Sequence, residues 1–315
     1  VEIIRGASAT TLYGTEAAGG VIQIFTKKGR AGQKAKWNIK TTTGTRYMSE
    51  YNMSPVIAKT DDWGFLKPWF KNGGVNATNL SVNGGTDQYR YFFSGGFDDQ
   101  IGVLDKNDSK LANIRGNFGF QPSANVRMDF NSSYASRETR YVESGDNGYG
   151  FMLNVLRGTQ DYTNAAVPQG FEGDPDILIW DIDNESSSEH FIFGAALNHS
   201  IPSLNIDTRL SYGLDYTDIL NRQTIPFDWP LLPRGRRDLN RYNHRTQSFE
   251  MSSTMRSKFG TSISSKLSVG GQIFNDRNHT LFAFSEDFGG PGPKTISSGG
   301  TKQSDESYIN VVTAG

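Results

Sequence analysis

The sequence of 315 residues contains no cysteine and only four histidines. Without cysteine there can be no disulfide bond, no thiolate metal site and no cysteine nucleophile. An HExxH zinc pair, a nucleophile elbow, a phosphate loop and a dinucleotide-binding fingerprint are also missing from the sequence. We therefore predict that the protein is not an enzyme and that it uses no cofactor.

Long hydrophobic runs are absent as well. No stretch approaches the roughly 18 to 20 consecutive apolar residues that a membrane helix requires, and the mean hydropathy of -0.53 is low. A transmembrane β-barrel is compatible with these values, because only alternate residues of its strands face lipid. The net charge of -1 gives no electrostatic argument for nucleic-acid binding.

What the sequence does contain is glycine, aromatic residues and strict alternation. There are 35 glycines, 20 phenylalanines and 13 tyrosines, a composition typical of turn-rich strands with aromatic girdles. The clearest strand runs from Leu204 to Tyr216. Its apolar face carries Leu204, Ile206, Leu210, Tyr212 and Leu214, and its polar face carries Asn205, Asp207 and Arg209. We expect the first set to face lipid and the second to face a lumen.

About ten such segments occur, and the loops between them alternate in length. Four connections are tight turns, at 84–87, 121–124, 201–203 and 260–262. Five are long polar segments, at 48–75, 98–110, 137–189, 217–244 and 285–304. Outer-membrane barrels have short periplasmic turns and long extracellular loops. The pattern therefore predicts an all-β fold, a partial transmembrane antiparallel β-barrel with strands about 9 to 11 residues long.

The first thirty residues differ from the rest, because two short apolar strands enclose a turn of small residues. The order is Val1 to Ile4, Arg5-Gly6, a Ser/Ala turn, Leu12-Tyr13-Gly14, Gly19-Gly20, an apolar strand and the basic exit Lys27-Lys28-Gly29. The segment resembles the end of the plug domain of TonB-dependent outer-membrane transporters. Within that family, its sequence is most similar to the SusC/RagA branch. The motif residues are Arg5, Gly6, Ala7, Ser8, Leu12, Tyr13, Gly14, Gly19 and Gly20.

This resemblance implies a fold, a function and partners. Residues 1–31 would be the C-terminal end of a plug domain, lying inside the lumen, and residues 32–315 the N-terminal part of the barrel. The function would be TonB-dependent import of an oligosaccharide, peptide or similar nutrient across the bacterial outer membrane. The partners would be the TonB energy-transducing protein, outer-membrane lipid and a SusD-like lipoprotein lid. The large plugged transporters have about 22 strands, so we expect an internal fragment that forms an open, curved sheet.

Other functions are compatible with the strand pattern alone. A passive porin or surface-binding barrel would show the same alternation without a plug. A secreted carbohydrate-binding β-sandwich would also alternate, although with shorter strands. A barrel-borne hydrolase is disfavoured by the missing catalytic motifs.

The long polar segments supply the candidate substrate residues. They are Trp180, Asp181, Asp183, Trp229, Arg234 and Arg236. An apolar segment around Trp180 must either pack on the barrel or offer an aromatic ring to a substrate. Asp174, Asp176, Asp181, Asp183 and Glu185 could hold a surface calcium ion, although they lack the spacing of a calcium loop. The arginines at 234, 236, 237, 241 and 245 are expected to pair with loop carboxylates or to contact lipopolysaccharide phosphates or an anionic substrate. A helix-like run at 151–156 is expected to enter the lumen.

Overall fold

The computed structural model describes residues 2–4, 19–23, 27–49, 69–144, 150–151, 175–229, 232–259, 263–292 and 295–315. Strands dominate this part of the chain. The named helical elements are the α-helix α5 (Pro175–Trp180) and the 3-10 turns η4 (Pro202–Leu204) and η5 (Ile296–Ser298). Among the described residues, no helix has the length and apolar character to cross a membrane.

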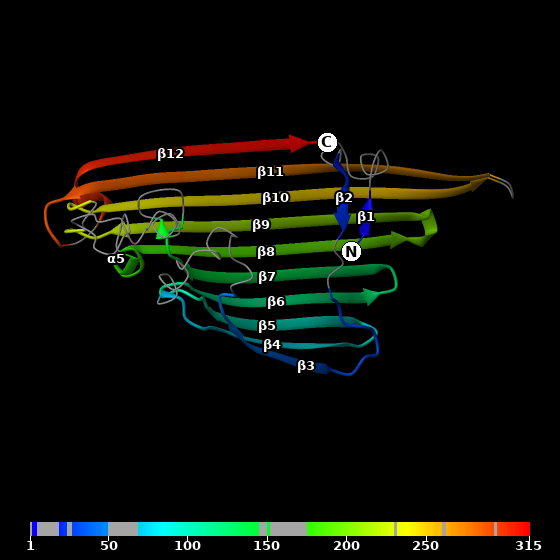
Figure 1. Cartoon of the computed structure of the whole chain (residues 1–315). Helices are drawn as coiled ribbons and strands as arrows, with labels where there is room; N and C mark the ends of the chain where they lie inside the picture. The colour runs from blue at the N-terminus through cyan, green and yellow to red at the C-terminus, as the bar shows by residue number, and fades with distance from the viewer. Residues whose placement is uncertain are drawn as a thin grey trace.

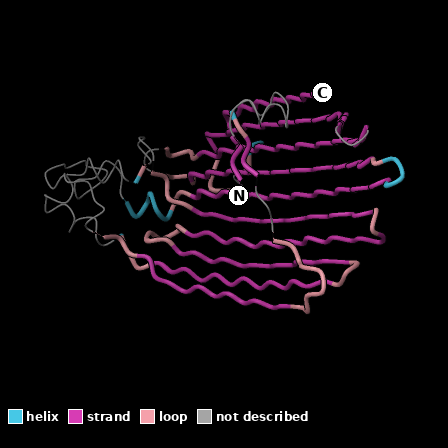
Figure 2. The backbone as a smooth tube through the Cα atoms, turned by 90° about the vertical axis from the view of Figure 1, so that its right-hand side faces the viewer, coloured by secondary structure: helices cyan, strands magenta, loops and turns pink. Residues whose placement is uncertain are grey.

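Ten strands form one antiparallel sheet in chain order, with each strand paired to its sequence neighbours (Figure 1). They are β3 (Lys36–Arg46), β4 (Gly73–Gly85), β5 (Tyr89–Ile101), β6 (Asp108–Ser123), β7 (Val126–Arg140), β8 (Asp183–Ile201), β9 (Ile206–Ile225), β10 (Arg236–Phe259), β11 (Ile263–Phe288) and β12 (Gly299–Ala314). The edge strands β3 and β12 are not paired with each other within the described residues, and the curvature of the sheet is visible in Figure 2. The predicted all-β fold, the strand count and the open sheet are confirmed.

A separate two-stranded sheet lies across the large one. It pairs β1 (Glu2–Ile4) with β2 (Val21–Gln23), and Ile3 lies opposite Ile22. In Figure 1 these strands run nearly perpendicular to the long strands and in front of them. Residues 21–23 are thus outside the wall of ten strands, as predicted. The rest of the predicted strand, Ile24 and Phe25, lies outside the described residues.

The register of the long strands sorts their side chains onto two faces. One row across the sheet contains Phe118, Phe130, Ala195, Tyr212 and Phe249, each directly opposite the next. We call this side the outer face. The next row contains Asn117, Asn131, Gly194, Gly213 and Ser248, and we call this side the inner face. Alternation along the strands therefore gives an apolar side and a polar side.

The two ends of the sheet also differ. Tight turns join β4 to β5, β6 to β7 and β8 to β9 at one end, which we call the turn end. The opposite end, which we call the loop end, carries α5 and the connection 226–235 (Figure 1). A small apolar core lies there, made of Leu178, Ile182, Ile225 and Trp229, with Leu232 packed against it.

The strands are longer than predicted. From β8 to β11 they have 19, 20, 24 and 26 residues, and the predicted loop 217–244 shrinks to 226–235. The predicted loops 98–110, 137–189 and 285–304 are shortened in the same way. The backbone continues to pair beyond the apolar stretch, because a polar side chain does not interrupt the hydrogen-bond ladder. Apolar alternation marks only the part of a strand that faces an apolar surrounding.

The predicted strand from Leu204 begins later than expected. Leu204 belongs to η4, and Asn205 caps that turn in the left-handed conformation with φ 53°, so neither residue lies on a strand face. The rest of the prediction is confirmed in register. Ile206, Leu210, Tyr212 and Leu214 share the outer face, and Asp207 and Arg209 lie on the inner face.

Candidate functional site

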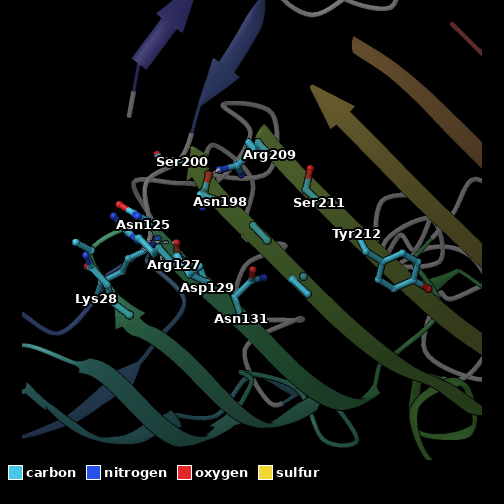
Figure 3. Close-up of a pocket in the computed structure, with 16 residues that line it drawn as sticks. Lys28, Asn125, Arg127, Asp129, Asn131, Asn198, Ser200, Arg209, Ser211 and Tyr212 are labelled. Atoms are coloured by element: carbon cyan, nitrogen blue, oxygen red, sulfur yellow. Dashed lines mark hydrogen bonds and ion pairs between the residues drawn. The ribbon is translucent and has the colours of Figure 1, made fainter. Parts of the chain in front are cut away.

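A polar pocket of about 580 Å³ opens on the inner face at the turn end. Its wall comes from β7, β8 and β9, whose inward residues alternate with the apolar outer row. In Figure 3, Lys28, Arg127 and Asp129 gather at one side and Asn198, Ser200 and Arg209 at the other. The polar lining includes Lys28, Asn125, Arg127, Asp129, Asn131, Asn198, Ser200, Arg209 and Ser211.

Charge in the pocket is arranged around Asp129. Its carboxylate forms ion pairs with Lys28, whose Nζ lies at 3.2 Å, and with Arg127, whose Nη2 donates a hydrogen bond at 3.2 Å. Across the pocket, Arg209 donates to Asn198 Oδ1 at 3.1 Å. Three cations and one carboxylate thus leave the pocket with an excess of positive charge. Side chains of this kind can bind the hydroxyl, carbonyl or carboxylate groups of a polar solute.

The segment after β2 is seated directly on the inner face. Asn117 donates from Nδ2 to the carbonyl of Lys27 at 2.6 Å, and Lys28 reaches Asp129 on the neighbouring strand. Gly29 is buried, and a Cβ there would lie 2.2 Å from the carbonyl oxygen of Gly84 and 2.5 Å from that of Tyr91. Only glycine allows the backbone to approach this closely. These contacts fix the basic exit against β4 to β7.

At the loop end, apolar side chains of the described residues pack together. Leu178 of α5 and Trp229 of the 226–235 connection are 1% and 2% exposed. Beneath them, Gln223 donates from Nε2 to Asn184 Oδ1 at 2.8 Å and to Glu143 Oε2 at 3.1 Å. Just beyond β7, burial raises the pKa of the Tyr141 phenol, and the negative charge of Glu143 adds to this.

The candidates near α5 are exposed. Trp180 is 51% exposed, although the preceding Leu178 and Ile179 are buried, so the apolar segment packs on the protein while the indole ring stays available. Asp183 accepts a hydrogen bond from Lys106 Nζ at 2.6 Å. The same amine donates to the carbonyl of Trp180. Asp181 is exposed at the end of α5.

The other three candidates are held by the protein itself. Trp229 is buried in the loop-end core. Arg234 approaches the carboxylate of Asp287 at 4.0 Å. Arg236 donates twice to the carboxylate of Asp238, at 2.7 Å each, and its guanidinium lies 4.8 Å from the ring centre of Phe284. The structure therefore brings these three residues into packing and ion pairs. Trp180, Asp181, Asp183 and Arg234 are exposed, and Asp183 and Arg234 are also in ion pairs.

The predicted basic loop is largely a strand. Arg236, Arg237, Arg241 and Arg245 belong to β10. Arg236 lies on the inner face, and the other three lie on the outer face four residues apart, so the arginines do not form one cluster. Arg241 forms a bidentate ion pair with Asp218, at 2.8 and 2.9 Å, as expected for pairing with carboxylates. Arg245 has a different environment, which is described below.

Several predicted residues lie outside the described part of the chain. These are the motif residues from Arg5 to Gly14, Asp174 and residues 152–156. Of the same predictions, Gly19 and Gly20 are described, and the φ of 104° at Gly20 explains why a glycine stands there. Phe151 is buried. Among described residues no group of three or more metal-binding side chains occurs, and the calcium site stays a prediction.

The inner-face pocket was not predicted as a site. Sequence alternation placed Asp207 and Arg209 on the polar side, but it could not show which residues of other strands lie beside them. The sequence does contain a basic run at Lys27-Lys28 and an acidic residue, Asp129, on the polar face of a strand. Pairing these opposite charges could have indicated the pocket. Joining Lys28 to Asp129, 101 positions apart in the chain, required the tertiary structure.

The chain is similar in sequence to two TonB-dependent receptors, although no protein-family model matches it. It is 25% identical over 235 residues to the TonB-dependent receptor P3 of Formosa agariphila, an alignment that covers 68% of this chain and 20% of that protein. It is 24% identical over 164 residues to the TonB-dependent receptor SusC of Bacteroides thetaiotaomicron, covering 45% of this chain and 16% of that protein.

Solved structures agree on the fold. The RagAB peptide transporter superimposes with a TM-score of 0.76 at 17% identity, covering 99% of this chain and 43% of that one. The closed-closed state of the RagAB peptide importer gives a TM-score of 0.74. The chain is thus similar in sequence to TonB-dependent receptors and shares the fold of the RagAB structures. The aligned part of the chain spans 16 to 20% of the length of the two receptors and 43% of the RagAB transporter chain.

Proposed function

We propose that this protein takes part in TonB-dependent import of a polar nutrient across the bacterial outer membrane. The observation that carries the proposal is the seating of the segment 27–29 on the polar face of the ten-stranded wall. A barrel whose lumen holds a folded plug cannot pass solutes by free diffusion. An energised movement of the plug is then needed, and the relatives are named for their dependence on TonB.

In this proposal residues 1–31 are the end of the plug and residues 32–315 a part of the barrel wall. The inner face lines the solute path, and the pocket beside Lys28 is its periplasmic portion. Trp180 and Asp181 form a solute contact at the extracellular side. A SusD-like lipoprotein would cover that side, by analogy with the RagAB and SusC relatives. The nutrient would be an oligosaccharide or a peptide, since the pocket offers hydrogen-bonding and cationic groups.

Uptake by cells tests the function. The gene is expressed in a bacterial strain that has an outer membrane and lacks this gene, and uptake of labelled oligosaccharides and peptides is measured with and without TonB. Import should require both the protein and TonB. Uptake that persists without TonB would instead support a passive porin, and no uptake of any solute with correct membrane insertion would favour a surface-binding barrel.

Chemical cross-linking tests the plug assignment. Because the chain has no cysteine, Lys28→Cys with Asp129→Cys gives a clean pair for a short bismaleimide. We expect efficient cross-linking within the intact protein. Lys28→Cys with Met128→Cys is the matched control, since Met128 lies one residue away on the outer face. Equal cross-linking of both pairs would contradict the seating of the exit segment on the inner face.

A further inference from the structure

Two arginines lie side by side on the outer face of the wall. Arg245 of β10 and Arg277 of β11 are directly opposite partners in the register. Tyr216 of β9 lies on the other side of Arg245 in the same row. Like charges directly opposite each other across a strand pair are destabilising. A pair of this kind needs a negative group to offset the repulsion.

No carboxylate among the described residues meets that need. Neither guanidinium forms an ion pair in this part of the chain, and the nearest outer-face carboxylate in the register, Asp218, is occupied by Arg241 in a bidentate pair. Both arginines are half-buried. Arg277 Nε is in addition buried with no hydrogen-bond partner among the described atoms. An unsatisfied buried donor is costly and points to an acceptor supplied from outside the chain.

The position of the two arginines along the strands indicates what surrounds them in the proposed membrane placement. On β11 the outer face carries Ile263, Leu267, Val269 and Ile273, all exposed. With strands rising about 3.4 Å per residue and tilted by about 45°, this stretch spans about 24 Å along the membrane normal. That height equals the apolar band of an outer-membrane barrel, about 25 Å.

The arginines lie just beyond this band, toward the loop end. Arg277 follows Ile273 by four residues, and Arg245 precedes Phe249 by four on the descending strand. Four residues of a tilted strand raise a side chain by roughly 10 Å. Lipid headgroups begin at this level, and Tyr216 in the same row is typical of a membrane interface.

We propose that Arg245 and Arg277 together bind the phosphate of an outer-leaflet lipid. Guanidinium groups form bidentate, charge-assisted hydrogen bonds with phosphate. One phosphate between the two arginines relieves their repulsion and supplies an acceptor to Arg277 Nε. The lipid's acyl chains then lie along the apolar side chains below. The inference rests on the membrane placement given in the proposed function.

The inner face of the same two strands offers a matched control. Arg256 and Lys266 are also directly opposite across β10 and β11, but Arg256 is paired with Asp207. The variants R245Q/R277Q and R256Q/K266Q therefore remove equal charge from opposite faces. R245K/R277K keeps the charge but not the planar donor fork.

Native mass spectrometry of the intact protein in detergent, titrated with diphosphoryl lipid A, tests the proposal. R245Q/R277Q should weaken lipid binding at least tenfold, as expected for losing hydrogen bonds to a charged group. R256Q/K266Q should stay within about twofold of the wild type, and R245K/R277K should retain an intermediate affinity. Dephosphorylated lipid A should bind the wild type as weakly as diphosphoryl lipid A binds R245Q/R277Q.

Three outcomes would overturn it. These are unchanged affinity in R245Q/R277Q, equal binding of dephosphorylated lipid A, and displacement of lipid A by equimolar inorganic phosphate. Phosphatidylglycerol binding that is lost in R245Q/R277Q would support the site for lipid phosphates in general. Uptake measured in the same strains separates the two proposals. Phosphate-dependent lipid binding with TonB-independent uptake would refute the import function and leave the lipid site standing.

Discussion

The outer and inner faces of the ten-stranded sheet are built from alternate residues of the same strands, yet their side chains are stabilised by different interactions. On the outer face, large apolar side chains such as Phe93, Phe249 and Val269 are about half exposed or more, and in the proposed membrane placement lipid hydrocarbon covers them. On the inner face, polar side chains find partners within the chain, as Asp129 does with Lys28 and Arg127. The stability of the outer face therefore depends on the medium around it, and that of the inner face depends on specific side-chain partners within the chain.

Exchanging charge between the faces should give the largest effect. Leu210→Arg places a cation near the middle of the apolar band, which costs about 2 to 4 kcal/mol of folding free energy in a bilayer. Arg209→Leu, one residue away, should cost only about 1 kcal/mol, since it removes one hydrogen bond to Asn198. Denaturant titration of the intact protein in lipid vesicles measures both. Equal costs would show that Leu210 does not face lipid.

A smaller effect is expected where the basic exit meets the inner face. Gly29→Ala drives a Cβ into the carbonyl oxygens of Gly84 and Tyr91, and overpacking of this kind costs about 1 to 3 kcal/mol. The exit should loosen, and the cross-linking yield of the K28C/D129C variant should fall when Gly29→Ala is added. Gly44→Ala is the control, because nothing lies within 4 Å of its Cβ. An unchanged yield for Gly29→Ala would contradict the close approach.

The smallest effect is expected for the ion pair that joins the exit to the wall. The side chain of Lys28 is 51% exposed and that of Asp129 20%, so solvent and salt screen their attraction. A double-mutant cycle of Lys28→Met and Asp129→Asn should give a coupling of about 0.2 to 1 kcal/mol that shrinks in high salt. Chemical unfolding at two salt concentrations measures it. A large, salt-independent coupling would mean that the pair is buried in the complete assembly.

Prediction from the sequence succeeded where the pattern is local. Alternation located the strands from β3 to β12, because a strand between an apolar and a polar surrounding must repeat every two residues. It failed at strand ends, as at 217–225 and 236–244, since paired strands outside the apolar band carry no such repeat. It also misplaced Leu204 and Asn205, which form a turn that strand periodicity does not describe.

The candidate site was only partly predictable. The exposed position of Trp180 and the burial of Trp229 could not be distinguished in advance, because both are tryptophans in polar connections. Burial was decided by Leu178 and Ile182, from α5 and the residues after it, and by Ile225 at the end of β9. The arginines of β10 likewise appeared as one cluster in sequence, and the strand register divided them between faces.

The sequence by itself determined the strand order and the two faces of the sheet, and it supplied the resemblance of the first thirty residues to the end of a plug domain, because each depends on patterns that lie close together in the chain. Only the tertiary structure placed Lys28 on Asp129 and Arg245 beside Arg277. Register between strands is set by all the pairings of the sheet together. The neighbours of a side chain across the sheet therefore cannot be read from any one segment.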